Sequence, residues 1–185
     1  MEILVISDSH LYGDDLIRVT EKYKNQVDMM IHCGDSSLPQ NDPTIQLYDI
    51  IVKGNHDEED FPIYQIYNDI CVTHGHYFHV YSGYEEMIAL CQKNHCKICF
   101  HGHTHVPTYQ VHQGIHFINP GSLMMNRGSY AYGTYALVKY NDPFVEVQYY
   151  HHHNDTVCPL EILEEGKELL EEFKNIVKNK AKLIY

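Results

Sequence analysis

The sequence predicts an α/β fold with one domain, in which two packed mixed β-sheets are flanked by helices (an α/β/β/α sandwich). Three observations support this prediction. Apolar runs alternate with a helical pattern in the first half, and short alternating runs fill most of the second half. The length of 185 residues suits one domain with a sizeable core.

The first half has a β-α-β pattern. Glu2–Ser7 and Asp28–Cys33 are apolar runs that predict buried strands, and Asp14–Asn25 between them has the spacing of a short amphipathic helix. This order predicts that the two strands pair in parallel through a right-handed crossover. Ile50–Lys53 is expected to form a third short strand.

Further elements follow, and the part after Lys97–His101 is expected to be antiparallel and rich in strands. Ile63–Tyr67 and Ile70–His74 suggest a hairpin, Tyr84–Asn94 a helix and Lys97–His101 a further strand. Four more short runs predict strands: Thr108–His112, Ile115–Ile118, Thr134–Tyr140 and Phe144–His151.

A separate amphipathic helix is predicted at Leu160–Lys182. Its apolar residues gather on one side, and its Glu-rich start and Lys-rich end suit the helix dipole. We therefore divide the chain into a domain at residues 1–158 and a C-terminal segment at 159–185. The apolar side of the helix is expected to pack on the same domain or on a partner subunit.

Composition restricts the class of protein. Hydrophobic residues make up 44% and charged residues 21%, which is typical of a soluble globular chain. The formal net charge of −12 argues against binding to duplex nucleic acid, which needs a basic face. No apolar run reaches the ~20 residues that a membrane span needs. The first residues lack a basic signal-peptide region, so a cytoplasmic protein is expected, with its 6 cysteines reduced and mostly buried.

Five short polar motifs each follow a predicted apolar strand. They are Asp8-Ser9-His10, Gly34-Asp35, Gly54-Asn55-His56-Asp57, His74-Gly75-His76 and Gly102-His103-Thr104-His105. In open α/β sheets the C-terminal strand ends form the ligand-binding crevice, so these motifs are expected to converge. Each motif taken alone also fits a surface or hydrogen-bonded histidine. All five together, rich in Asp, Asn and His, predict a metal centre.

The order and content of these motifs resemble the calcineurin-like metallophosphoesterase superfamily. The short chain and the later Asn119-Pro120-Gly121-Ser122 are similar to its small bacterial and archaeal phosphodiesterase branch, the YfcE-like group. The resemblance extends over about Met1 to His151. It implies a dinuclear centre with one metal held by Asp8, His10, Asp35 and His105, and a second held by Asp35, Asn55, His74 and His103. Asp35 would bridge the two metals.

The resemblance implies the hydrolysis of phosphodiester bonds in small substrates by a metal-activated water. Two cations would bind the phosphate oxygens and lower the pKa of the water that attacks phosphorus in line. Mixed imidazole, carboxylate and amide ligands suit Mn, Fe, Ni, Co or Zn better than Ca or Mg. We expect Mn. The branch also implies a homo-oligomer, either a dimer or a tetramer.

His56 is implied as the catalytic residue that is not a metal ligand, acting as an acid or by binding phosphate. Asp57 is expected to orient it and to raise its pKa. Many members of the small branch have Cys in place of this His, so the sequence departs from them toward the wider superfamily. Four further residues are candidates for substrate contacts: His76, Asn119, Ser122 and Arg127. A surface arginine in an ion pair is an equal alternative for Arg127.

Several alternatives stay open. The same site could serve a phosphomonoesterase. The chain could also be a weakly active nucleotide-binding protein, or a non-catalytic scaffold like the retromer subunit that shares this fold. The run His151-His152-His153 invites a metal-site interpretation, but solvent-exposed histidines at a strand end are expected. The native substrate, the physiological metal and the oligomeric state are not decided by the sequence.

Overall fold

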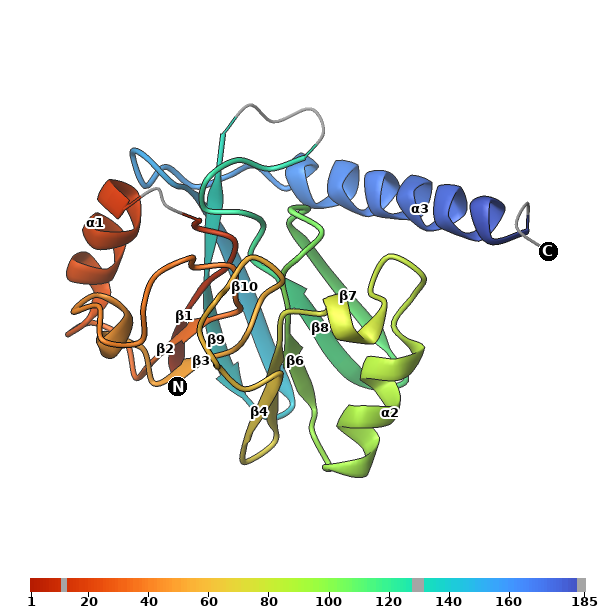
Figure 1. Ribbon diagram of the computed structural model, residues 1–185, viewed down its shortest axis with the longest axis horizontal. Coiled ribbons are helices and arrows are strands. Elements are labelled where there is room, and N and C mark those ends of the chain that lie inside the picture. The colour runs from red at the N-terminus through yellow and green to blue at the C-terminus, as the bar shows by residue number, and fades with distance from the viewer. Residues whose placement is uncertain (11–12, 128–131, 183–185) are drawn as a thin grey trace.

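The computed structural model describes residues 1–10, 13–127 and 132–182 (Figure 1). It contains two five-stranded mixed sheets. The first has the order β10 (Phe144–His151), β9 (Thr134–Asn141), β1 (Glu2–Ile6), β2 (Met29–His32), β3 (Ile50–Ile51). The second has the order β4 (Tyr64–Tyr67), β5 (Ile70–Thr73), β6 (Ile98–Phe100), β8 (Ile115–Asn119), β7 (Thr108–His112). The predicted α/β fold with two sheets is confirmed.

Strand pairing follows the prediction in the first sheet, but the second sheet is less antiparallel than expected, because β8 pairs parallel with β6. β1 and β2 are parallel, with Val5 opposite Ile31, and β3 continues the parallel side of the first sheet. β9 and β10 complete that sheet as an antiparallel hairpin. In the second sheet β5, β6 and β8 are parallel, while β4 and β7 pair antiparallel at its edges.

The alternation of side chains along β1 explains the layers. Ile3 and Val5 are buried in the cluster between the sheets, together with Val72 and Phe100 of the second sheet. Leu4 and Ile6 point the other way, into a cluster that α1 covers. Successive strand residues face opposite sides of a sheet, so a fully apolar β1 is buried on both faces.

Two helices cover the outer faces of the sheets, on opposite sides of the molecule (Figure 1). α1 (Gly13–Tyr23) buries Leu16 and Val19 against the first sheet. α2 (Glu85–Lys93) buries Met87 and Cys91 against the second. Two short 3₁₀ helices, at Ile45–Leu47 and His76–Phe78, add to the predicted elements.

The helix α3 (Glu161–Lys182) crosses one end of the sandwich and extends beyond it (Figure 1). Ile162 and Leu170 are fully buried in the two clusters that line the second sheet. Gly166 permits this approach, because a Cβ there would lie 2.3 Å from the carbonyl oxygen of Pro107. Farther along, Ile176 is exposed. No described helix is long and apolar enough to cross a membrane.

Candidate metal centre

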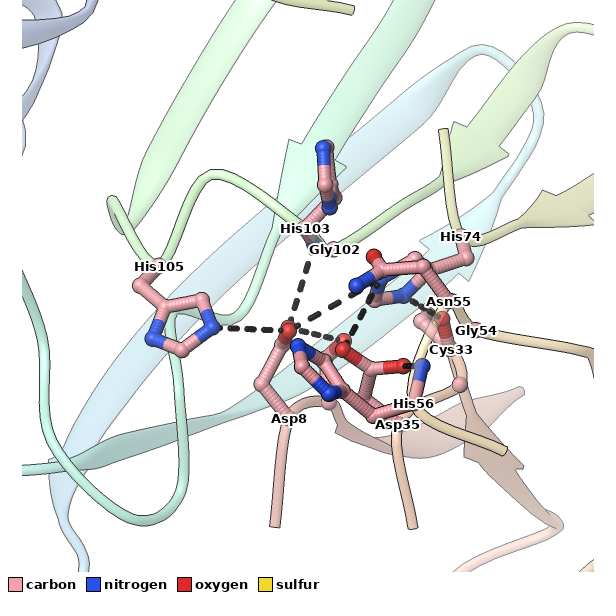
Figure 2. A network of polar contacts seen from close by, with 12 residues as sticks. Asp8, Cys33, Asp35, Gly54, Asn55, His56, His74, Gly102, His103 and His105 are labelled. Carbon is pink, nitrogen blue, oxygen red and sulfur yellow. Dashed lines mark hydrogen bonds and ion pairs between the residues drawn. The ribbon is translucent and has the colours of Figure 1, made fainter. Parts of the chain in front are cut away.

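The polar motifs meet where the parallel strands of both sheets end (Figure 2). Asp8 and His10 follow β1, Asp35 follows β2, Asn55 follows β3, His74 follows β5, and His103 and His105 follow β6. Ligand atoms of Asp8, His10 and His105 lie within 4.8 Å of one another, and so do those of Asp8, Asp35 and His74. Asn55 Oδ1 lies 3.3 Å from His74 Nε2, and the rings of His74 and His103 have centroids 5.1 Å apart. All seven residues predicted as ligands are therefore gathered in one place.

Asp8 lies at the middle of this group and is fully buried. Its Oδ2 accepts hydrogen bonds from the Ser7 hydroxyl at 2.6 Å and from the His103 N–H at 3.1 Å. Its Oδ1 lies 3.0 Å from His105 Nε2 but has no hydrogen bond. A buried carboxylate oxygen without a donor is costly unless a cation faces it, so this atom fits a metal ligand.

His74 has the arrangement expected of a ligating imidazole. Its Nδ1 lies 2.8 Å from the carbonyl oxygen of Cys33, to which it donates (Figure 2). The lone pair on Nε2 then faces Asp35 Oδ2 at 3.4 Å and Asp8 Oδ1 at 3.9 Å. A backbone acceptor that fixes the tautomer of a metal-binding histidine is a common feature of metal sites.

Electrostatics also favour a cation here. Burial alone raises the pKa of Asp8, but the imidazoles of His74 and His105 outweigh it and hold that pKa well below its ordinary value. Burial opposes protonation of His74, yet Asp8 and Asp35 raise its pKa. The two buried carboxylates thus create a negative field that positive charge stabilises.

The backbone of the ligand loops is unusual. Five of the seven predicted ligands have positive φ, namely Asp8 (51°), His10 (47°), Asp35 (56°), His103 (67°) and His105 (58°). This left-handed conformation is uncommon outside glycine and clusters at functional sites, where the surrounding structure enforces it.

Two glycines allow the loops to approach each other. A Cβ at Gly102 would lie 1.9 Å from Ser7 Oγ and 2.7 Å from Asp8 Oδ2. A Cβ at Gly54 would lie 2.0 Å from Asp35 Oδ1. Each glycine therefore makes room for a carboxylate of the candidate centre.

The structure corrects the role expected for Asp57. This buried carboxylate accepts four hydrogen bonds at 2.8–3.2 Å, and none of the described contacts joins it to the His56 ring. The donors are the N–H groups of Asp35, Ser37 and Gly54 and the hydroxyl of Ser36. Asp57 holds two ligand loops together instead of orienting His56.

His56 itself is exposed beside the centre. Its backbone N–H donates to Asp35 Oδ1 at 2.7 Å, and its ring centroid lies 5.3 Å from that of His10. The backbone is therefore tied to a predicted ligand, while the residue stays exposed to solvent.

Asn119 and Ser122 were expected at the edge of a substrate pocket, but both are fully buried. The amide of Asn119 donates to the carbonyl of Gly102 at 3.0 Å and to Thr104 Oγ1 at 2.9 Å. The Ser122 hydroxyl donates to the carbonyl of Asp8 at 2.9 Å. The side chains of both residues are therefore engaged in holding the ligand loops.

His76 and Arg127, the other two substrate candidates, lie at the rim. The His76 ring is half-buried with its centroid 5.2 Å from that of His74, and burial lowers its pKa to about 4. Arg127 is exposed, and its Nη1 donates to the hydroxyl of Tyr81. Its backbone N–H donates to the His105 carbonyl at 2.9 Å.

Two residues that support the site were not expected from the sequence. Tyr81 donates to the His103 carbonyl at 3.3 Å, and its ring packs edge-on against His103 with centroids 5.1 Å apart. His32 accepts from the Gly34 N–H at 3.2 Å and contacts Ser9 Oγ at 3.0 Å, which links two ligand loops. The position of His32 inside the apolar run Asp28–Cys33 was a signal in the sequence that this histidine is buried and has polar partners.

Two packed mixed sheets with Asp, Asn and His at their strand ends define the metallophosphoesterase class of proteins. The chain belongs to the calcineurin-like phosphoesterase superfamily, whose domain model matches residues 1–143. Proteins of this family use divalent metals and hydrolyse phosphoesters.

Individual relatives support this assignment. The probable metallophosphoesterase YsnB of Bacillus subtilis is 33% identical over 162 residues, which cover 81% of this chain and 90% of that protein. The crystal structure of a predicted phosphoesterase from Streptococcus pneumoniae is 34% identical, with a TM-score of 0.77 over 85% of this chain and 92% of that one. Vps29 from Entamoeba histolytica, crystallised with zinc, is 20% identical, with a TM-score of 0.65 over 85% and 96% of the two chains, and shows the fold alone.

Proposed function

We propose that this chain hydrolyses phosphodiester bonds of small substrates with two divalent metal ions. The observation that carries the proposal is the buried Asp8 Oδ1, which has no hydrogen-bond donor and faces both His105 and His74. Around it lie imidazole, carboxylate and amide atoms, a mixed set that suits manganese, iron, nickel, cobalt or zinc. Manganese is the ion we favour.

The donor set divides into two groups that share a carboxylate. Asp8, His10 and His105 form one group of neighbouring ligand atoms, and Asp8, Asp35 and His74 form the other. The carboxylate common to these two groups is Asp8, whereas the family pattern assigns the shared position to Asp35. Asp35, Asn55 and His103 would join His74 in holding the second ion. When bound, such ions supply positive charge for phosphate oxygens and lower the pKa of coordinated water.

The residues of the chain supply the remaining functions. Hydrolysis breaks the bond from phosphorus to the leaving oxygen and forms one from phosphorus to a water oxygen. The exposed His56 imidazole lies beside the centre with freedom to approach the leaving group, so it donates the proton that the leaving alkoxide needs. Asp57, Asn119 and Ser122 keep the ligand loops in place.

The central test compares metal-loaded and chelator-treated protein on aryl and alkyl phosphodiesters and on the matching monoesters. We expect faster hydrolysis of diesters and no turnover without metal. Asp35→Asn should bind fewer ions than the wild type, measured by elemental analysis, and should lose hydrolysis at the same time. Protein that holds two ions per chain yet hydrolyses none of these esters would refute the proposal. Faster turnover of the monoesters would replace it with a phosphatase.

The acid role of His56 has a sharper test. His56→Ala should keep its metal content but lower kcat by about 10²–10⁴-fold. The defect should be larger for an alkyl leaving group than for a nitrophenyl group, because nitrophenolate leaves without protonation. His79→Ala, which removes another exposed histidine, is the matched control. An equal defect with both leaving groups would assign His56 to phosphate binding.

The fold also admits a scaffold, since Vps29 shares it. Because Vps29 from Entamoeba histolytica was crystallised with zinc, metal content alone does not separate the two functions. Turnover does, and the ester panel is therefore the deciding measurement.

A further inference from the structure

A second group of potential metal ligands lies outside the centre, where α1 begins and β10 ends. Asp15 is in the first turn of α1, and His152 and His153 directly follow β10. His152 Nδ1 lies 3.2 Å from Asp15 Oδ2, and His153 Nδ1 lies 3.1 Å from Asp15 Oδ1. One ligand atom from each residue lies within 4.8 Å of the other two.

The spacing of these atoms suits a transition metal. With metal–nitrogen bonds of about 2.1 Å, neighbouring ligands are about 3.4 Å apart in a tetrahedral site and about 3.0 Å apart in an octahedral one. The distances from Asp15 to His152 and His153 fall between these values.

The hydrogen bonding of His152 is incomplete without a cation. Its Nδ1 is buried, has no hydrogen-bond partner and faces the carboxylate of Asp15, which is only 9% exposed. Burial lowers the pKa of His152, although Asp15 opposes the shift. A cation bound between Nδ1 and the carboxylate would give this buried nitrogen a partner.

The neighbouring basic side chains leave room for a cation. Arg18 Nη1 lies 2.9 Å from both carboxylate oxygens of Asp155, and Lys22 Nζ lies 2.8 Å from one of them. Asp15 has only a looser contact with Arg18, at 3.7 Å. The side chain of His153 is 74% exposed, which gives an ion a path to the site.

We infer that Asp15, His152 and His153 form a third metal site, mononuclear and separate from the candidate centre. Two imidazoles and a carboxylate suit Zn²⁺, Co²⁺ or Ni²⁺, with water filling the remaining positions. The ion would join the start of α1 to the end of β10. Asp15 and His153 are 138 positions apart in the sequence, so the site would link distant segments of the chain.

Titration of the full-length chain with Co²⁺ tests this site. Visible absorption and the number of ions bound are measured at each step. His153→Ala and Asp15→Asn should each bind one ion fewer than the wild type. His79→Ala, an exposed histidine outside the site, should bind as many ions as the wild type. His153→Ala changes an exposed side chain, so its folding should be unaffected. The site should bind Co²⁺ with a dissociation constant at or below about 10 µM.

A second measurement separates this inference from the proposed function. In Asp35→Asn, where the candidate centre is disabled, Co²⁺ should still raise the melting temperature, and adding His153→Ala should abolish the increase. His153→Ala alone should hydrolyse esters like the wild type. If both variants of the site keep the full number of ions, or if binding is not saturated at about 100 µM, the third site does not exist.

Discussion

Replacing Asp57 by Asn tests how the ligand loops are held. Two backbone N–H groups, of Asp35 and Gly54, point at Oδ2 at 2.8 Å, while Ser37 N–H and the Ser36 hydroxyl point at Oδ1. An amide nitrogen at Oδ2 would face two N–H donors, whereas at Oδ1 it would face the Ser37 N–H and a Ser36 hydroxyl that can turn to accept. Asp57→Asn therefore loses at least one hydrogen bond to a charged acceptor, which contributes about 1.5–3 kcal/mol.

The expected loss is at least about 1.5–3 kcal/mol of unfolding free energy, a substantial part of the ~5–15 kcal/mol typical of a domain. Urea unfolding of the metal-free protein measures it, with an unchanged m-value if only the native state is affected. Metal affinity should also fall, because the Asp35 backbone loses its anchor. Ser36→Ala removes one of the four donors and should cost about 1 kcal/mol.

The refuting result is specific. If Asp57→Asn unfolds at the wild-type urea midpoint, binds metal normally and loses only turnover, then the carboxylate acts on His56, as the sequence first suggested. The structural role is supported if Asp57→Asn loses both stability and metal. Its remaining activity should then depend on the leaving group as the wild-type activity does.

Three further changes have defined outcomes. Gly102→Ala should weaken metal binding at least ~10-fold, measured by competition with a chelator, because a Cβ there overlaps Ser7 Oγ. The metal-free protein should lose stability as pH falls from 6.5 toward 4. Burial lowers the pKa of His32 to about 4 in the folded state, while the unfolded chain takes up its proton near 6.5. His32→Gln should flatten this part of the plot of urea midpoint against pH, and an unchanged slope would contradict the prediction. Phe173→Ala should raise KM a few fold with metal content intact, because its ring packs edge-on against Tyr81 at 5.9 Å; an unchanged KM would show that Tyr81 does not need this support.

The strands and the ligand loops were predictable because both depend on local pattern. Apolar runs such as Glu2–Ser7 place a strand, and a polar motif at its end places Asp8 near the crevice. The direction in which each side chain of a motif points could not be predicted in the same way. Asp57 and Asn119 lie close to their expected places but point into buried networks. Asp57 accepts from the Asp35 N–H of another loop, and Asn119, at the end of β8, donates to the loop that carries Gly102 and Thr104.

Contacts between residues far apart in the sequence could not be predicted either. His152 and His153 suggested exposed strand-end residues, and the carboxylate next to them in the sequence, Asp155, pairs with Arg18 and Lys22 instead. Asp15 contacts them only after β10 and α1 pack side by side. Likewise, Tyr81 is one of 16 tyrosines, and only the fold shows that it lies between α3 and the candidate centre.

The candidate ligands come from both layers of the sandwich, with Asp8 and Asp35 on one sheet and His74 and His103 on the other. Ions bound between them would act as a cross-link. At about 100 times the dissociation constant, one such ion adds ~2.7 kcal/mol to the stability of the fold. A cell depleted of metal would then lose the protein to proteolysis as well as losing its activity, so metal supply would set the lifetime of the chain.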